Sequence, residues 1–208
     1  MTESEAENWN DAMPPASPGE DIRWFHMLLE YLPGSPIRLS QDPRIINIGC
    51  GNRVIWNFLG VCLFLESQGL GLPEYVAVDL SEAHFAEAKE KLSGTATFVV
   101  ADAQGLSEHV QGDFDLVIIQ HPDISVSPES PGKWRNIFRE ANHLMSNTGG
   151  LILTTFWLND HLPAQLALQH LGFSISDSQP NKYPGKQFDT SSKGEPLVMD
   201  KYILLATR

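Results

Sequence analysis

The sequence predicts a doubly wound α/β protein, in which a mostly parallel sheet of seven strands carries helices on both faces. Two observations predict this fold. Strand-like runs such as "YVAVDL" and "ATFVVAD" lack the polar alternation of half-exposed strands, so both of their faces are expected to be buried. Stretches with helical periodicity separate these runs, as the crossover connections of a parallel sheet require.

The individual elements follow from periodicity and from capping residues. Segment 21–32 (DIRWFHMLLEYL) has apolar residues at helical spacing and ends before Pro33 and Gly34. Ser81 is a suitable N-cap, and Gly69 and Gly94 are suitable helix ends. Further helices are expected at 54–69, 81–92, 132–146 and 162–172. Strands are expected at 44–50, 75–80, 96–102, 114–121, 150–157, 173–178 and 197–208.

Length and composition indicate one domain. The chain has 208 residues, of which 42% are hydrophobic, enough for one substantial core. We expect this domain to span residues 19–208. Residues 1–18 are acidic, contain three prolines and carry few apolar residues, so we expect a disordered segment there. We leave open what this segment does.

The charge and hydropathy of the chain limit which substrates and cellular locations are expected. The net charge of −12 and the absence of a basic run disfavour a nucleic-acid substrate. No apolar stretch is long enough to span a membrane, and the N-terminus lacks the pattern of a signal peptide, so we expect a cytoplasmic protein. The two cysteines, Cys50 and Cys62, make neither a disulfide framework nor the spacing of a zinc site, and we expect no metal.

Candidate ligand-binding residues follow the strands, because ligands of such sheets bind at the carboxyl ends of the strands. A Gly-x-Gly turn after the first strand allows close approach of a ligand to the backbone. Asp79 is placed to accept hydrogen bonds from a ribose diol, and Asp102 to meet an adenine edge. The predicted cofactor-binding residues at these positions are Gly49, Cys50, Gly51, Asp79, Leu80, Asp102, Ala103 and Gln120.

Five motifs in order resemble those of the class I S-adenosylmethionine-dependent methyltransferases, which have a Rossmann-like fold. "INIGCGN" resembles the family's glycine-rich motif, "VAVDLS" its acidic motif after strand two, and "VVADA" its adenine-side motif. "FDLVIIQH" is similar to the family's strand four, and "LMSNTGGLILTTF" to its helix, glycine pair and strand five. The resemblance covers residues 44–157 and implies S-adenosyl-L-methionine as cofactor. Two positions depart from the pattern: Asn47 replaces an acidic residue and Arg53 replaces a third glycine. The resemblance makes Asn47 a further predicted cofactor-binding residue, because its amide can orient the amino-acid end of the cofactor.

A nicotinamide dinucleotide is the alternative ligand of a Gly-x-Gly turn. That fingerprint requires another glycine three residues after the second, but position 54 is Val. Asp79 also lies farther along the chain than the roughly 20 residues expected for the ribose-binding acid. S-Adenosylmethionine has no phosphate and needs only close backbone approach, which the turn permits. We therefore favour the sulfonium cofactor over the dinucleotide.

His121, directly after strand four, is the predicted catalytic residue. Imidazole is the side chain suited to accept a proton near neutral pH, and segment 120–134 is long for a simple connector. A histidine that is merely hydrogen-bonded within a loop is the alternative. The other helical histidines, His84 and His161 among them, are expected at the surface or as caps. Asp79 as a helix cap and Asp102 as a solvated acid also remain open.

The predicted function is methyl transfer from S-adenosylmethionine to a small-molecule acceptor. Aminopropyl transfer is the enzymatic alternative, because Asp123 after strand four could hold an amine. A non-catalytic cofactor-binding module is the other alternative, favoured by Asn47 and Arg53. Helix 21–32 and the loop 179–196, expected to lack regular structure, are candidates for covering the site. The acceptor and the oligomeric state do not follow from the sequence.

Overall fold

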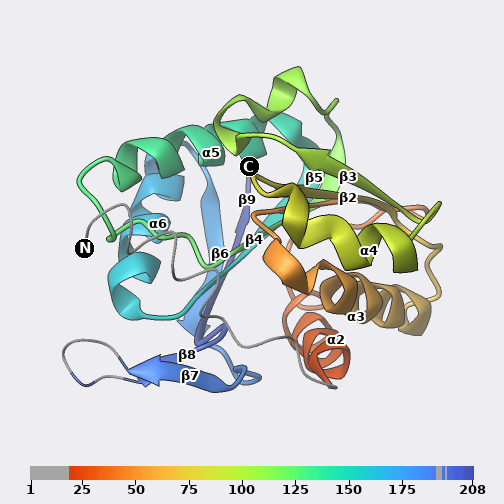
Figure 1. The fold of residues 1–208 in the computed structure, drawn as a ribbon, viewed down its shortest axis with the longest axis horizontal. Coiled ribbons are helices and arrows are strands. Elements are labelled where there is room, and N and C mark those ends of the chain that lie inside the picture. The colour runs from red at the N-terminus through yellow and green to blue at the C-terminus, as the bar shows by residue number, and fades with distance from the viewer. Residues whose placement is uncertain (1–18, 191–193, 195) are drawn as a thin grey trace.

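A computed structural model describes residues 19–190, 194 and 196–208 (Figure 1). The disorder expected for residues 1–18 therefore lies outside the described residues. The main sheet has seven strands in the order β3-β2-β1-β4-β5-β9-β6. The first five are parallel, and β9 pairs antiparallel with both β5 and β6. The predicted fold class is confirmed.

The elements have the following bounds. The helices are α2 (Glu20–Tyr31), η1 (Gly51–Arg53), α3 (Val54–Ser67), η2 (Glu82–Phe85), α4 (Ala86–Lys91), η3 (Ala103–Glu108), α5 (Ser130–Leu144) and α6 (Leu158–His170). The strands are β1 (Arg44–Ile48), β2 (Glu74–Asp79), β3 (Ala96–Val100), β4 (Phe114–Gln120), β5 (Met145–Thr155), β6 (Ser174–Pro180), β7 (Gln187–Thr190), β8 (Pro196–Val198) and β9 (Tyr202–Thr207).

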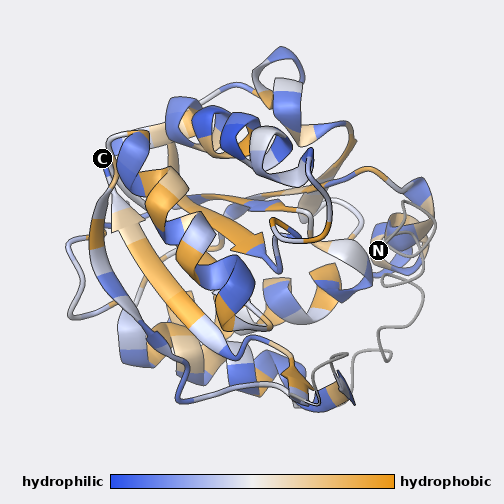
Figure 2. Ribbon diagram, turned by 90° about the vertical axis from the view of Figure 1, so that its left-hand side faces the viewer, coloured by the Kyte–Doolittle hydropathy of each residue, from blue (hydrophilic) through white to orange (hydrophobic). Residues whose placement is uncertain are grey.

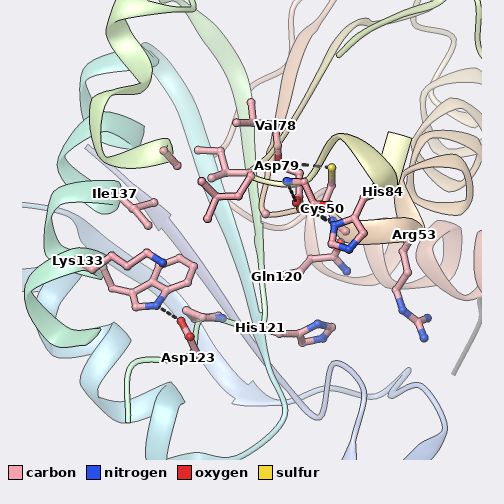
Figure 3. A pocket seen from close by; sticks show the side chains of 18 of the residues that line it. Cys50, Arg53, Val78, Asp79, His84, Gln120, His121, Asp123, Lys133 and Ile137 are labelled. Atoms are coloured by element: carbon pink, nitrogen blue, oxygen red, sulfur yellow. Dashed lines mark hydrogen bonds and ion pairs between the residues drawn. The ribbon is translucent and has the colours of Figure 1, made fainter. Parts of the chain in front are cut away.

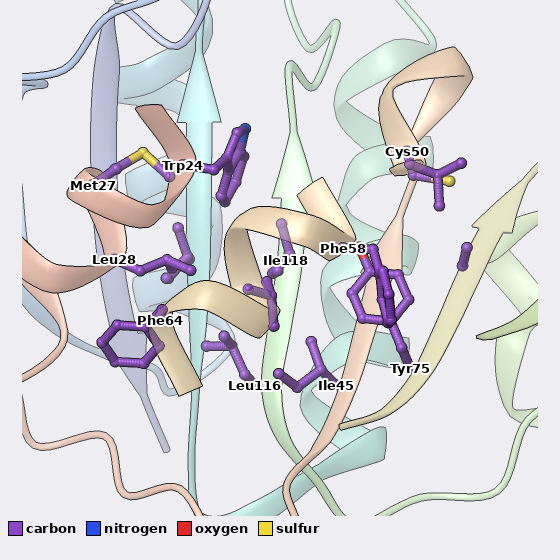
Figure 4. Packing of buried hydrophobic residues seen from close by; sticks show 14 of the residues in the cluster. Trp24, Met27, Leu28, Ile45, Cys50, Phe58, Phe64, Tyr75, Leu116 and Ile118 are labelled. Atoms are coloured by element: carbon purple, nitrogen blue, oxygen red, sulfur yellow. The ribbon is translucent and has the colours of Figure 1, made fainter. Parts of the chain in front are cut away.

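Helices cover both faces of the sheet. Helices α2, α3 and α4 lie on one face and α5 and α6 on the other (Figure 1). The central strands are mostly hydrophobic, whereas the outer helices mix both kinds of residue (Figure 2). On the first face Phe64 of α3 packs with Leu28 of α2 and Leu116 of β4 (Figure 4). Strands from both halves of the described chain join one sheet, and the single domain at 19–208 stays a prediction.

Helix α2 packs closely on α3 at a glycine. A Cβ atom on Gly60 would lie 2.5 Å from the Cβ atom of Trp24 and 2.7 Å from the carbonyl oxygen of Asp21. Both distances are shorter than van der Waals contact allows. Gly60 therefore sets how near α2 can come to α3, and this fixes the position of the charged side chains that α2 carries.

The C-terminal quarter of the chain differs from the prediction. The single strand expected at 197–208 is two strands, β8 and β9, separated around Asp200, whose φ is 48°. The loop expected at 179–196 is not structureless, because β7 lies within it and pairs antiparallel with β8. The break lies at Asp200, whose side chain accepts hydrogen bonds from Arg23 and Thr154, and the local sequence does not indicate which residues these partners are.

Other boundaries shift for identifiable reasons. Strand β5 begins at Met145 and not at the predicted position 150, so Gly149 lies inside the strand together with Gly150. A Cβ atom on Gly150 would lie 2.2 Å from the side chain of Ile37, which explains the glycine by close packing. The helix expected at 81–92 is a 3₁₀ turn followed by the short α4, and the 3₁₀ helix η3 at 103–108 had no strong periodic signal.

The strand order reverses at β1, which lies between β2 and β4. Connections from β1 and from β4 therefore leave on opposite faces of the sheet and open a crevice above the carboxyl ends of these strands. No helix in the described part of the chain is long and apolar enough to cross a membrane.

Candidate functional site

A cavity of about 280 Å³ lies at this switch point, above the carboxyl ends of the strands (Figure 3). Arg53 and His84 lie on one side of it, Asp123 and Lys133 on the other, and Gln120 lies between them (Figure 3). The predicted residues that line this cavity are Gly49, Cys50, Gly51, Asp79, Leu80, Asp102, Ala103, Gln120 and His121.

The glycine turn presents its backbone to the cavity. Gly49 has φ 67° and Gly51 has φ 55°, both in the left-handed region that other residues adopt at a cost. A Cβ atom at either position would meet no described atom within 4 Å, so the space beside both glycines is open. The N–H of Gly49 donates to the carbonyl of Val78 at 2.9 Å, which ties the turn to β2.

Asp79, at the end of β2, already holds three donors. Its Oδ2 accepts from the N–H of Gly51 at 2.9 Å, and its Oδ1 accepts from the N–H of Ser81 at 2.9 Å. The same Oδ1 lies 2.9 Å from Nδ1 of His84. A carboxylate has about four acceptor positions, so a ribose diol that takes two of them requires His84 to move away. The bond to Ser81, the residue directly before η2, orders the start of that helix but does not cap it, and Asp79 borders the cavity.

His84 corrects a prediction. It was expected at the surface or as a cap, but it lines the cavity and contacts Asp79. His161 also differs, because it is buried, contacts the hydroxyl of Ser178 through Nε2 at 2.9 Å, and has a pKa lowered by burial. Neither position is marked by helical periodicity, since each depends on what packs opposite the helix.

The segment after β3 forms another wall of the cavity. Asp102 caps η3 by accepting from the N–H of Gln104 at 2.9 Å, and its side chain lines the cavity as well. Leu80 lines the cavity and is 60% exposed, so an apolar surface is available there for a planar ligand group. These contacts are compatible with Asp102 as part of an adenine site and also with Asp102 as a solvated acid.

Gln120 has an unsatisfied donor. Its Oε1 accepts from Nδ2 of Asn57, and its Nε2 is buried without a hydrogen-bond partner among the described residues. A buried amide without a partner carries a free-energy penalty that a ligand acceptor would remove. Because Gln120 lines the cavity, its Nε2 fits a polar group of a ligand bound there.

Asn47 does not line the cavity. Its side chain is fully buried within β1, and its Nδ2 donates to the hydroxyl of Tyr75 at 3.0 Å. Its Oδ1 finds no partner in the described ranges. The geometry therefore does not support the direct cofactor contact predicted for Asn47, because the amide faces a neighbouring strand and not the crevice.

Arg53 lines the cavity although it is buried. Its Nη1 lies 3.5 Å from Oε2 of Glu20 on α2, so its charge is balanced by a carboxylate from another element. Cys50 is also buried, and burial together with the nearby charge of Asp79 raises the pKa of its thiol well above the usual value. Cys50 is accordingly a thiol and not a thiolate at the cavity wall.

His121 is fixed on several sides. Its φ is 51°, its N–H donates to the carbonyl of Thr154 at 2.8 Å, and its ring stacks on Phe156 with centroids 3.9 Å apart. The Nε2 atom lies 2.9 Å from Oδ1 of Asp200. Neither Asp200 nor Phe156 was predicted. An acid within the apolar run "LVMDKYILL" was the available signal for Asp200.

The far wall of the cavity combines indoles and carboxylates. Nε1 of Trp134 donates to Oδ1 of Asp123 at 2.5 Å, and Nε1 of Trp157 donates to Asp160. Burial raises the pKa of Asp160, while hydrogen bonds from Ser125 and Trp157 counteract the rise. These two carboxylates hold the aromatic walls in position. Among the described residues, no group of three or more His, Cys, Asp or Glu side chains is placed to hold a metal ion.

Comparison with known proteins gives fold-level matches only. No family model matches the chain, and no curated protein sequence matches it. An S-adenosylmethionine-dependent methyltransferase from Clostridium acetobutylicum matches with a TM-score of 0.62 and 12% identity over 90% of this chain and 91% of its own.

Two further solved structures are named for different acceptors. A precorrin-6y C5,15-methyltransferase from Geobacter metallireducens has a TM-score of 0.57 and 16% identity, over 88% of this chain and 87% of its own. A ribosomal protein L11 methylase from Lactobacillus delbrueckii has a TM-score of 0.58 and 12% identity, over 93% and 80%. The chain therefore has the fold of the class I S-adenosylmethionine-dependent methyltransferases.

Proposed function

We propose that the chain binds S-adenosyl-L-methionine in this cavity and transfers its methyl group to a small-molecule acceptor. One observation carries the proposal. The open glycine turn, Asp79 and Asp102 meet Gln120 and His121 in one cavity at the switch point of the sheet. A fold alone does not establish an activity, so the proposed activity rests on these side chains.

The residues fit the parts of the cofactor. Asp79 would accept hydrogen bonds from the ribose hydroxyls, and Asp102 with Ala103 would border the adenine. Gln120 Nε2, buried without a partner in the described chain, would donate to the amino-acid end of the cofactor. Arg53 would place a positive charge near its carboxylate. When bound, the cofactor supplies an electrophilic methyl group, and the electron pair of the broken methyl–sulfur bond stays on sulfur.

The acceptor class is supported by the cavity itself. Its walls of Trp134, Phe156 and Trp157 suit an acceptor with an apolar body. The net charge of −12 disfavours nucleic acid. A cytoplasmic location is part of the proposal and is supported by two free cysteines. Imaging of a fluorescent fusion in cells tests that location.

Binding and transfer are tested separately. Calorimetric titration with S-adenosylhomocysteine is expected to show one site per chain, and absence of binding at millimolar ligand overturns the proposal. Transfer is measured with methyl-labelled cofactor against phenols, alcohols, amines and thiols. Product in a protein or RNA fraction in place of these compounds contradicts the small-molecule assignment.

A second candidate function is aminopropyl transfer, favoured by the carboxylate of Asp123 at the cavity wall. It would require decarboxylated S-adenosylmethionine, and methylthioadenosine would be the product in place of S-adenosylhomocysteine. Detection of that product identifies it. Tight cofactor binding with no transfer to any acceptor class would identify a non-catalytic module.

A further inference from the structure

Asp200 carries a fully buried carboxylate that meets His121 beside the cavity. Its Oδ1 lies 2.9 Å from Nε2 of His121 and accepts from the hydroxyl of Thr154 at 2.5 Å. Its Oδ2 accepts from Nη2 of Arg23, on α2, at 2.7 Å. Asp200 has φ 48°, and a non-glycine residue in this conformation is held there by its surroundings.

Two contacts compete for the same nitrogen of His121. Nε2 lies 3.2 Å from the backbone N of Asp200, where it would accept a proton, and 2.9 Å from Oδ1, where it would donate one. A neutral imidazole nitrogen cannot do both. The contact with the carboxylate is shorter and charge-assisted, and hydrogen bonds of that kind are about twice as strong as neutral ones. The geometry favours the proton on Nε2.

We propose that Asp200 is a positioning residue that holds His121 in the Nε2–H tautomer, which leaves Nδ1 to accept the proton of an acceptor O–H or N–H group. This inference rests on the proposed function, because it assigns a base to the proposed transfer. Nδ1 has no hydrogen-bond partner within the described part of the chain, while His121 lines the cavity.

The charges around Asp200 keep it ionised. Burial by itself would raise the pKa of this carboxyl, but the positive charge of Arg23 and the contact with His121 lower it far below its usual range. Arg23 is held in turn by Glu20, whose Oε2 lies 2.7 Å from its Nη2. Glu20 also faces Arg53 at the cavity. The carboxylate of Asp200 is thus a fixed acceptor.

A base held at this position speeds up methyl transfer only to acceptors that must lose a proton. As the bond between the acceptor atom and the methyl carbon forms, the acceptor proton passes to Nδ1 of His121, and the positive charge of the sulfonium ends on the imidazolium. Asp200 then stabilises that charge across Nε2. An acceptor with no proton to lose, such as a thioether or a tertiary amine, would gain nothing from this pair. The acceptor class is therefore a hydroxyl or an uncharged nitrogen that carries an N–H bond and keeps its lone pair.

The tautomer is measured by nitrogen NMR on protein labelled at histidine, at a pH where the His121 ring is neutral. A His121→Asn variant identifies the signals. In the wild type we expect the proton on Nε2. Asp200→Asn retains an acceptor oxygen and should keep this tautomer, whereas Asp200→Ala should lower the ratio of Nε2–H to Nδ1–H at least tenfold.

The outcomes are decisive even if Asp200→Ala does not fold. A wild-type ring protonated on Nδ1 overturns the inference without any variant. An unchanged tautomer ratio in folded Asp200→Ala also overturns it, because the carboxylate would then have no control of the ring. Titration of the same wild-type sample with S-adenosylhomocysteine keeps this result separate from the proposed function, since loss of cofactor binding overturns only the latter.

Discussion

Oδ2 of Asp79 accepts a hydrogen bond from the backbone N–H of Gly51 at 2.9 Å. The acid at the end of β2 and the glycine turn after β1 therefore form one unit. Asp79 fixes the backbone that a ligand would approach, while the same carboxylate borders the cavity. A substitution at either residue is expected to affect ligand binding more than folding.

Asp79→Ala should weaken binding of S-adenosylhomocysteine by about 2–4 kcal/mol, because hydrogen bonds to a charged acceptor are lost and the turn is released. Calorimetry measures the affinity. Glu82→Ala is the matched control, since it removes the same charge from the next turn of chain, where Glu82 pairs with the exposed Lys89. The control should bind as the wild type does. Equal affinity for all three proteins would remove Asp79 from the site.

Gly51→Val should abolish measurable binding, because its side chain would fill the open space beside the turn. The substitution also strains the backbone, since Gly51 has φ 55°. Gly69→Val controls for strain, because Gly69 has φ 70° at the end of α3 and does not line the cavity. Both variants should lose thermal stability, but only Gly51→Val should lose binding of S-adenosylhomocysteine. Retained binding by Gly51→Val would make the turn purely structural.

The first four strands could be predicted because each is a mostly apolar run. Strands β1, β2 and β4 are largely buried, whereas β3, at the edge of the sheet, is not buried on both faces as expected. Parallel topology then places the residues after them at one edge of the sheet, which is why Gly51, Asp79, Asp102 and Gln120 meet as predicted. The sequence wrongly placed Asn47 at the cavity. Its position in the motif does not show that its amide donates to the hydroxyl of Tyr75 on β2.

Residues supplied by other elements could not be predicted. Asp200 reaches the site through pairing of β9 in the sheet, and Phe156 through the turn that follows β5. Arg23 depends on how near α2 packs to α3. These placements arise from tertiary packing, and the local pattern around each residue is that of an ordinary strand or helix.

His121→Ala should leave the affinity for S-adenosylhomocysteine nearly unchanged and lower turnover on the order of 10²-fold or more, because the base acts on the acceptor. His121→Asn should fail similarly, since an amide cannot accept the proton. His109→Ala is a control at a histidine outside the cavity. Turnover of His121→Ala within threefold of the wild type would leave catalysis to positioning alone.

Gly60→Ala should destabilise the fold by about 1–3 kcal/mol, because the new Cβ atom would collide with Trp24 and with the carbonyl of Asp21. Gly132→Ala in α5 is the control, and the opposite effect on stability is expected for it. A Cβ atom there meets nothing within 4 Å, so alanine should stabilise the helix by a few tenths of a kcal/mol or more. Urea unfolding measures both. Equal effects would mean that α2 can shift without cost.

Asp200→Asn should destabilise the protein most near neutral pH. The pKa of Asp200 is lowered by folding, so its carboxylate contributes stability above its unfolded pKa, which lies near 4, and this contribution is lost as the pH falls below that value. Removing one partner of a buried ion pair costs about 3–5 kcal/mol, here because Arg23 loses its buried partner. The difference from the wild type should therefore be largest at pH 7 and shrink at pH 3.

Urea unfolding of wild type and variant at pH 7, 5, 4 and 3 measures this difference. Asp189→Asn is the control, because Asp189 is an exposed acid on β7, and its difference from the wild type should stay small throughout. The groups that face Asp200 are Arg23 of α2, Thr154 of β5 and His121 after β4. A difference that stays constant from pH 7 to pH 3 would mean that Asp200 is not held ionised by Arg23 and His121.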